Sequence, residues 1–151
     1  MNYLVIDPSI TQAGLALFND SGQILHTEMI KFNSKKFSQE QRMFQLYDRM
    51  KSLVEQNPGD FEIICEKQFV NIMSEIVGVV KCFAGSDQDS RIKTTFFPPS
   101  KWKKMATGKG NVPEEDLRIF VEAKFPDMKD KSEHEIDCAA MFFAVTKKSQ
   151  K

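Results

Sequence analysis

The sequence has no net charge, few cysteines and no long apolar run. Basic and acidic residues number 21 each, so no charge excess indicates disorder or a polyanionic protein. The three cysteines show no Cys-x-x-Cys spacing, which argues against a zinc site and fits a reduced, cytoplasmic protein. No apolar run approaches the roughly 18 residues of a membrane span, and no signal-peptide pattern opens the sequence. We therefore expect a cytoplasmic protein without a membrane partner.

The sequence does contain enough apolar material for one core. Apolar residues make up 41% of the 151 residues and charged residues 28%, which is typical of a globular domain. Because the sequence has no internal repeat, low-complexity tract or interdomain linker, we expect a single domain over residues 1–151. The balanced charge does not exclude nucleic acid as a partner, since the location of the lysines matters more than their sum.

The spacing of apolar residues predicts an α/β order of elements. Capping-box pairs, Ser38 with Gln41 and Ser132 with Glu135, indicate where two of the helices begin. The predicted order is β-β-β-α-β-α-β-α-α, with antiparallel strands first and helical crossovers between the later, parallel strands. Strands are expected at residues 2–7, 13–18, 23–32, 61–66 and 92–97, and helices from 38 to about 56, over 71–84, from 113, and over 132–145.

Acidic residues end two of the expected strands. Side-chain alternation puts Tyr3, Val5 and Asp7 on one side of the first strand, with Asp7 at its carboxyl end. Glu66 ends the strand "FEIICE" in the same way. Neighbouring parallel strands lie about 4.8 Å apart, so the two carboxylates repel each other unless a proton or a cation intervenes. Ligands of open α/β sheets bind at this edge, and Mg²⁺ prefers oxygen ligands.

A third group of polar residues opens the last expected helix. His134 and Asp137 are three residues apart and therefore share a helix face. Each of these residues has an ordinary structural explanation when it is taken separately. Asp7 before Pro-Ser is typical of a turn, and Glu66 is typical of a solvated strand end. The pair of His134 and Asp137 is typical of a helix cap. Together they form the set of side chains that two-metal phosphoryl transfer requires.

The expected helix over residues 71–84 is apolar around more than half of its circumference. One apolar stripe would pack on the sheet. The other would pack on a second subunit, although burial between the sheet and another helix explains the pattern equally well. The candidate interface residues are Ile72, Met73, Ile76, Val77, Val80 and Phe83.

A lysine-rich segment precedes the helix that starts at Pro113. Its cations surround Trp102 and two glycines, and phosphate binding needs such cations together with a backbone that can approach closely. A solvated loop with Trp102 folded inward is the alternative. The candidate phosphate contacts are Lys101, Lys103, Lys104 and Lys109, with Lys35, Lys36, Lys147 and Lys148 as weaker candidates.

In these motifs the sequence resembles the RuvC-like Holliday-junction resolvases of the ribonuclease H-like superfamily. The resemblance covers nearly the whole chain and rests on the order of "VIDPS" with Gly14 after it, "IICEKQF", "KWKKMATGKGNVPEEDL" and "HEIDCAAMFFA". Many members have glycine after Asp-Pro, where this chain has Ser9, and Lys67 follows Glu66 where no charge is required.

The resemblance implies a mixed five-stranded sheet of order 3-2-1-4-5 flanked by helices. It also implies a homodimer that cleaves a four-way DNA junction symmetrically by two-metal phosphodiester hydrolysis, with two Mg²⁺ ions per site and Mn²⁺ as a substitute. The implied catalytic and metal-binding residues are Asp7, Glu66, His134 and Asp137. Phe69 matches the aromatic residue that enters the junction centre.

Two other functions fit the same residues. One is another ribonuclease H-like nuclease that acts on branched DNA or RNA, because a metal cluster reads neither sequence nor shape by itself. The other is a catalytically silent scaffold that binds junctions. The cleavage sequence, the helicase or ligase partners, and a bacterial rather than a viral origin stay open.

Overall fold

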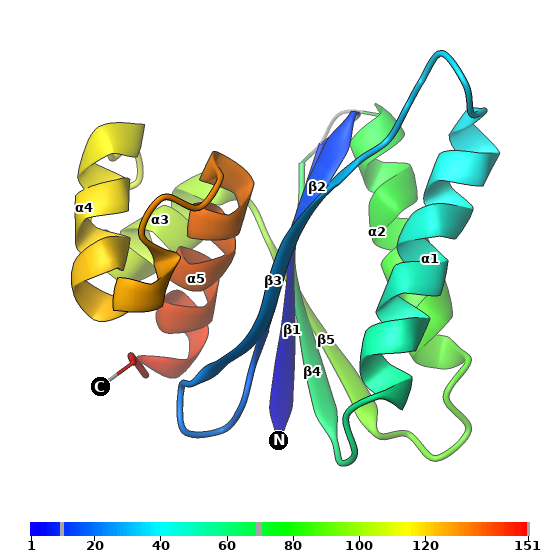
Figure 1. The fold of residues 1–151 in the computed structure, drawn as a ribbon, viewed down its shortest axis with the longest axis horizontal. Helices are drawn as coiled ribbons and strands as arrows, with labels where there is room; N and C mark the ends of the chain where they lie inside the picture. The colour runs from blue at the N-terminus through cyan, green and yellow to red at the C-terminus, as the bar shows by residue number, and fades with distance from the viewer. Residues whose placement is uncertain (10, 69–70, 151) are drawn as a thin grey trace.

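In a computed structural model, the described part of the chain forms a five-stranded sheet with helices on both faces (Figure 1). The structure describes residues 1–9, 11–68 and 71–150, and for residues 71–73 it describes the backbone alone. The strands are β1 (Asn2–Pro8), β2 (Gln12–Phe18), β3 (Ile24–Lys31), β4 (Phe61–Glu66) and β5 (Ile92–Phe97). The helices are α1 (Gln39–Glu55), α2 (Asn71–Gly85), α3 (Pro99–Thr107), α4 (Glu114–Lys124), the short 3-10 helix η1 (Pro126–Met128) and α5 (Glu133–Thr146).

The strand order is β3-β2-β1-β4-β5, which confirms the predicted sheet. β1 pairs antiparallel with β2 and parallel with β4, and β5 pairs parallel with β4. The β2–β3 hairpin turns where the sequence predicts it, because Asn19 Oδ1 accepts hydrogen bonds from the backbone amides of Ser21 and Gln23. Gly22 closes this turn with a φ of +88°, a backbone conformation that favours glycine.

Two helical layers cover the sheet. Helices α1 and α2 lie on one face, and α3, α4 and α5 lie on the other (Figure 1). Side-chain alternation divides β1 between the layers, since Leu4 and Ile6 pack toward α1 while Val5 packs toward α5. Helix α5 docks on β2 through Phe142, whose ring stacks on that of Phe18 with a centroid distance of 4.0 Å. None of the helices in the described residues is long and apolar enough to cross a membrane.

The lysine-rich segment contains a helix that the sequence analysis missed. Pro98 and Pro99 follow β5, and Pro99 begins α3, where the fixed φ of proline suits a first helical turn. Trp102 on α3 is fully buried in the core on the α5 side of the sheet. Trp102 therefore folds inward, as the alternative expected, but a helix rather than a solvated loop presents most of these lysines. Their contact with phosphate stays a prediction.

Helix α2 forms where it was expected, but its apolar residues face inward. Ile76, Val80 and Phe83 belong to the core between the sheet and α1 and are at most 6% exposed in the single chain. Val77 is buried as well. These four side chains have no free surface for a partner, so their assignment to a subunit interface gives way to the alternative of simple burial. The side chains of the other two candidates, Ile72 and Met73, lie outside the described residues.

Candidate active site

The two strand-borne acids lie side by side at the carboxyl edge of the sheet. β1 and β4 are parallel neighbours whose register pairs Ile6 with Cys65, so Asp7 and Glu66 occupy the next position on each strand. Because Val5 and Ile64 pack on the α5 side of the sheet, the two carboxylates point to that side as well. Asp7 is 3% exposed and Glu66 is 4% exposed. Both acids are therefore removed from bulk water.

Helix α5 brings a third acid to this edge. Ser132 and Glu135 form the predicted capping box, which begins the helix beside the strand ends. Asp137 lies one turn into the helix, and one carboxylate oxygen from each of Asp7, Glu66 and Asp137 lies within 4.8 Å of the others. Three residues separated by most of the chain thus form one acidic cluster.

The close approach of α5 to the sheet depends on Gly14. This residue pairs with Asp7 in the β1–β2 register, directly below the start of α5. A Cβ atom at Gly14 would lie 2.6 Å from the backbone carbonyl carbon of His134, too close for any side chain. Glycine is therefore required at this position if α5 is to carry Asp137 to the two strand ends.

His134 lies beside the acidic cluster and contacts one of its members. Its Nδ1 is 2.7 Å from Asp7 Oδ2, and its Nε2 is 3.0 Å from the side-chain nitrogen of Gln12. Both ring nitrogens are thus hydrogen-bonded to the protein. His134 is thus a hydrogen-bond partner of Asp7 and lies next to the group of three carboxylates. Its assignment as a fourth ligand stays a prediction.

The electrostatic surroundings of the cluster favour protonation of two carboxyl groups. Burial raises the pKa of Asp7 well above its ordinary value, and the neighbouring Glu66 raises it further. Burial also raises the pKa of Asp137 to about 7, and the charge of Glu66 adds to this effect, while a hydrogen bond with Asp7 and the charge of Lys103 oppose it. The charge of Lys103 therefore only partly offsets the effects of burial and of Glu66 on Asp137.

The donor set fits a divalent cation. Carboxylate oxygens are the ligands that Mg²⁺ prefers in proteins, and three of them converge here, two from buried residues and one from the half-buried Asp137. Among the ion pairs of the described residues, none joins a lysine or arginine to these carboxylates. A bound cation would supply the missing charge and lower the raised pKa values of Asp7 and Asp137.

The lysines predicted to contact phosphate divide into two groups. Lys101 and Lys104 on α3 and Lys109 after it are exposed, while Lys103 is half-buried and close enough to Asp137 for its charge to lower the pKa of that acid. Lys148 instead pairs with Asp20 at 2.9 Å, at the opposite edge of the sheet. Lys147 donates a hydrogen bond to the backbone oxygen of Met105.

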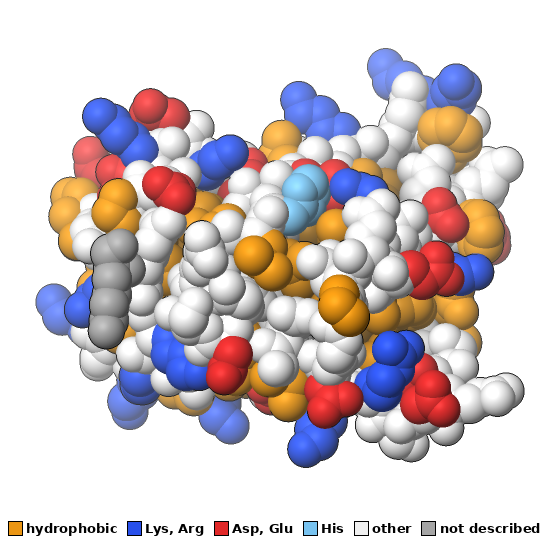
Figure 2. Space-filling view, turned by 60° about the horizontal axis from the view of Figure 1, so that its bottom comes forward, with side chains coloured by type: hydrophobic (Ala, Val, Ile, Leu, Met, Phe, Trp, Pro, Cys, Tyr) orange, Lys and Arg blue, Asp and Glu red, His pale blue; other side chains and the backbone are white. Residues whose placement is uncertain are grey.

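Charged side chains of both signs are interspersed on the face shown in Figure 2, and they do not gather into one continuous basic surface there. Lys35 and Lys36 are exposed in the loop between β3 and α1. This loop lies at the same edge of the sheet as Asp7, because the last residue of β3, Lys31, pairs with Gln12. Phe69, the candidate junction-entering residue, lies outside the described residues.

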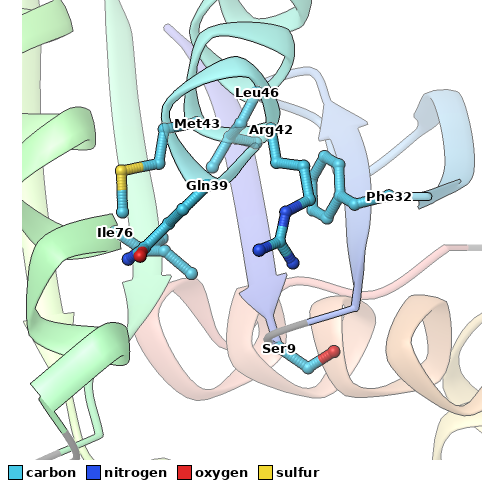
Figure 3. A pocket seen from close by; sticks show the side chains of 7 residues that line it. All are labelled: Ser9, Phe32, Gln39, Arg42, Met43, Leu46 and Ile76. Atoms are coloured by element: carbon cyan, nitrogen blue, oxygen red, sulfur yellow. The ribbon is translucent and has the colours of Figure 1, made fainter. Parts of the chain in front are cut away.

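A narrow cavity opens on the other side of the sheet, between α1 and the end of β1 (Figure 3). Its volume is about 30 Å³, enough for a water molecule or two but too small for a nucleobase. None of the three acids of the cluster lines it. The cavity is lined by Ser9, Phe32, Gln39, Arg42, Met43, Leu46 and Ile76.

Two glutamines near the cluster were not found by sequence reasoning. Gln12 contacts the ring of His134, and Gln68 donates a hydrogen bond of 2.9 Å to Glu66 Oε1. A glutamine at the start of a strand or in a loop is common on protein surfaces, so neither residue carries a signal in the sequence alone. Their proximity to the acids follows only from the assembled fold.

The sheet order and the two helical layers define a ribonuclease H-like fold. Among solved structures, the chain is similar to Thermus thermophilus RuvC, with a TM-score of 0.76 and 19% sequence identity over 95% of this chain and 92% of that chain. A second similar structure is T. thermophilus RuvC in complex with a Holliday junction substrate, with a TM-score of 0.72 and the same identity and coverage. No protein-family model and no curated protein sequence matches the chain.

Proposed function

We propose that this chain is a structure-selective DNA endonuclease that resolves four-way Holliday junctions, with residues 1–151 acting as one nuclease domain. The observation that carries the proposal is the convergence of Asp7, Glu66 and Asp137 within 4.8 Å at the carboxyl edge of the sheet. The fold shared with T. thermophilus RuvC, of which one structure contains a Holliday junction, supports the choice of substrate. Cleavage of other branched DNA or RNA, and silent junction binding, are outcomes of the test below.

The proposed cofactor is a pair of Mg²⁺ ions, with Mn²⁺ as a substitute. Bound divalent ions lower the pKa of a coordinated water and neutralise charge that develops on a phosphate. One oxygen of Asp7 lies within 4.8 Å of an oxygen of Glu66 and of Asp137. We therefore assign Asp7 as the proposed shared ligand, and the other two acids would hold one ion each. Gln68 fixes the orientation of Glu66 by donating to Oε1.

The proposed DNA path crosses the carboxyl edge of the sheet between two groups of lysines. One group lies on and after α3, which follows β5, and consists of Lys101, Lys103, Lys104 and Lys109. The other group lies in the loop after β3 and consists of Lys35 and Lys36. Their charges would bind backbone phosphates and position the scissile bond, without reading the base sequence. Insertion of Phe69 into the junction centre stays a prediction from the resemblance.

Symmetric cleavage of a four-way junction requires two active sites, so we include a homodimer in the proposal. Because the apolar residues of α2 are buried, we now assign contact between subunits to the opposite face of this helix. Ser74, Gly78 and Cys82 are exposed there at intervals of four residues. A Cβ atom at Gly78 would have no neighbour within 4 Å, so a larger residue can be introduced without disturbing the single chain.

The dimer is tested with Gly78→Arg and with a thiol cross-linker. We expect the wild type to sediment as a dimer and Gly78→Arg to sediment as a folded monomer that loses paired nicking. Cys82 is the exposed thiol, whereas Cys65 and Cys138 are buried, so a bismaleimide should join two chains through Cys82 and fail with Cys82→Ser. A monomeric wild type would contradict the proposed dimer, and a dimeric Gly78→Arg would contradict the assignment to this face.

The activity is tested by nicking of synthetic four-way junctions in Mg²⁺. We expect cleavage of the junction but not of a linear duplex of the same sequence, and no cleavage by Asp7→Asn. The matched control is Asp60→Asn, which changes an exposed aspartate at the opposite end of the sheet.

Each of the other outcomes of this assay supports a different function. Duplex cleaved as readily as the junction would overturn the resolvase assignment in favour of a less selective nuclease. Junction binding without cleavage, in both Mg²⁺ and Mn²⁺, would favour a scaffold.

A further inference from the structure

Two aromatic side chains share one hollow at the start of α1. Phe44 is 65% exposed, and Phe37, just before the helix, is half-buried. The hollow has a volume of about 380 Å³, in contrast to the cavity of about 30 Å³ shown in Figure 3. A single exposed apolar side chain is common on protein surfaces, but two aromatic rings around one hollow favour a binding surface. The hollow is lined by Phe37, Glu40, Gln41, Phe44 and Gln45.

The ring of Phe44 is held in place by neighbouring aromatic side chains. It stacks on Tyr47 with a centroid distance of 6.4 Å and an angle of 12° between the ring planes. Tyr47 packs edge-on against Phe83 at 5.3 Å, and Phe83 belongs to the core. One face of the Phe44 ring is thus supported by the protein, and the exposure of the ring leaves the opposite face for a planar ligand.

Two cations flank the hollow on the loop between β3 and α1. Lys36 Nζ lies 5.2 Å from the centre of the Phe37 ring, and Lys35, next to it in the chain, is exposed. Asn33 orders this loop, because its Oδ1 accepts hydrogen bonds from the backbone amides of both lysines and its carbonyl oxygen accepts from the amide of Phe37. Among the ion pairs of the described residues, none involves Lys35 or Lys36, so both charges are available to an anion.

The hollow lies toward the edge of the sheet that carries the acidic cluster. In Figure 1 the loop after β3 and the start of α1 lie at the end of the molecule opposite the N-terminus. Because β1 begins at the N-terminus, Asp7 at its carboxyl end lies toward the same end. A DNA strand that passes the acidic cluster along this edge would therefore reach the hollow.

The chemistry of the hollow fits an unpaired nucleotide strand. Each base has a flat face that stacks on aromatic side chains, and the phosphates between the bases bind lysine. In a duplex the neighbouring base pairs cover these faces, so a phenylalanine on the protein surface has no base face to contact. Of the residues that line the hollow, Glu40 is acidic and should weaken the binding of phosphate.

We propose that Phe37 and Phe44, together with Lys35 and Lys36, bind single-stranded DNA by base stacking and phosphate contact. The choice of DNA among nucleic acids rests on the proposed nuclease function. The hollow is on the α1 side of the sheet, whereas the carboxylates point to the α5 side. The stacking surface is therefore distinct from the acidic cluster, and the two can be tested separately.

A tryptophan at position 44 reports stacking directly. The chain has a single tryptophan, the fully buried Trp102, so Phe44→Trp adds an exposed indole to a chain without one. We expect the emission of this indole to be quenched when an oligothymidylate is added in a chelator, where no cleavage takes place. The matched control is Ile119→Trp on α4, because Ile119 is also 65% exposed, and its emission should not change. No quenching at position 44, or equal quenching at position 119, would overturn the proposal.

Loss of the ring should weaken the binding of single-stranded DNA but not of duplex DNA. Stacking of one base on an aromatic side chain corresponds to about 5-fold or more in affinity. We expect Phe44→Ala to lower the affinity for oligothymidylate by this factor in fluorescence anisotropy. Phe44→Trp should retain the wild-type affinity, and so should Ile119→Ala. An equal loss for a duplex of the same length, or no loss for the single strand, would contradict stacking at Phe44.

The charges around the hollow give an independent test of the phosphate contacts. Replacement of Lys35 and Lys36 by glutamine should reduce the slope of log affinity for oligothymidylate against log salt concentration by about 0.7 for each lost contact. Glu40→Gln should raise the affinity, because it removes a charge that repels phosphate. A lower affinity after Glu40→Gln, or an unchanged slope without the two lysines, would contradict the binding of an anionic strand here.

Failure of the proposed function would be distinguishable from failure of this inference, because binding in a chelator needs no cleavage. If the protein binds oligothymidylate through Phe44 but cuts no junction, the nuclease proposal fails and the stacking surface stands. If it cuts junctions while Phe44→Ala leaves single-strand binding unchanged, the stacking surface fails. Loss of self-association in Phe44→Ala, measured by sedimentation, with unchanged DNA binding would assign the ring to a contact between copies of the chain and overturn the proposal.

Discussion

The strand-borne and helix-borne halves of the acidic site are positioned by different forces. Asp7 and Glu66 follow from the register of two parallel strands, which a ladder of backbone hydrogen bonds fixes along its whole length. Asp137 and His134 reach the site only because α5 crosses β2 at Gly14, where a single Cβ atom would prevent the contact. The positions of Asp7 and Glu66 should therefore tolerate substitutions around them. The positions of Asp137 and His134 depend on Gly14, which carries no functional group.

The largest expected effect is that of Gly14→Ala, which tests whether the helix-borne pair depends on this glycine. The added methyl group meets the backbone of α5 rather than a flexible side chain, so the helix must shift away from the sheet. We expect cleavage to fall on the order of 100-fold, because misplacing catalytic groups by about 1 Å has this effect. Overpacking should also reduce the free energy of unfolding by about 1–3 kcal/mol. Junction nicking and chemical denaturation measure the two effects.

The control for this prediction is Gly85→Ala on α2, where an added Cβ has no neighbour within 4 Å. Its activity should match that of the wild type, and its free energy of unfolding should be equal or higher by up to about 1 kcal/mol, because alanine favours a helix over glycine. If Gly14→Ala retains full cleavage, α5 can adjust without moving Asp137, and the proposed dependence of the helix-borne pair on Gly14 would be wrong.

A smaller effect is expected from pH, and it should report on the helix-borne acid. The folded-state pKa of Asp137, about 7, lies above its ordinary value of 3.8, so the folded protein binds this proton more tightly than the unfolded chain. The free energy of unfolding of the cation-free protein should therefore decrease as pH rises from about 4 to about 7. Asp137→Asn should match the wild type near pH 4 and exceed its stability near pH 8 by on the order of 2 kcal/mol.

Thermal denaturation of both proteins in a chelator, across this pH range, measures the difference. Saturating Mg²⁺ should reduce the pH dependence of the wild type, because the bound cation takes the place of the proton. A wild type that becomes more stable than Asp137→Asn as pH rises in the chelator would show that Asp137 already has a counter-charge in the protein.

The smallest expected effect is that of Lys103→Gln, which removes the cation closest to the helix-borne acid. Lys103 lowers the pKa of Asp137, so its loss should raise that pKa and shift the pH profile of cleavage upward. We also expect the affinity for the junction to fall by a few-fold. The slope of log affinity against log salt concentration should decrease by about one, the value for one lost phosphate contact. Lys148→Gln, at the opposite edge beside Asp20, is the control and should alter neither quantity.

Patterns with a local cause were predictable from the sequence. Both capping boxes and the acid at each of two strand ends follow from side-chain alternation and helix-start signals over a few residues. The strand order was implied by the resemblance to the RuvC-like resolvases. The convergence of Asp137 with the strand ends was also expected, because its helix face was defined by the spacing from His134. These inferences need no knowledge of how distant side chains fill the core.

Features that depend on packing were not predictable in the same way. Trp102 and the helix around it were hidden by the surrounding lysines, whose exposure says nothing about a buried ring on the same segment. The apolar stripes of α2 fit either a core or an interface, and the distinction depends on where α1 lies. The hydrogen bonds of Gln12 and His134 join residues 122 positions apart, so no local pattern contains them.

The contact between His134 and Asp7 spans 127 positions of the chain, from the first strand to the last helix. An N-terminal fragment that lacks α5 would contain the sheet and two of its acids but no complete cluster. During synthesis, the ability to hold cations between all three carboxylates should therefore arise only after α5 has been made and has docked. Under the proposed nuclease function, a nascent or truncated chain would then be unable to cut DNA. Addition of a separate α5 peptide to such a fragment would be a direct way to restore the site.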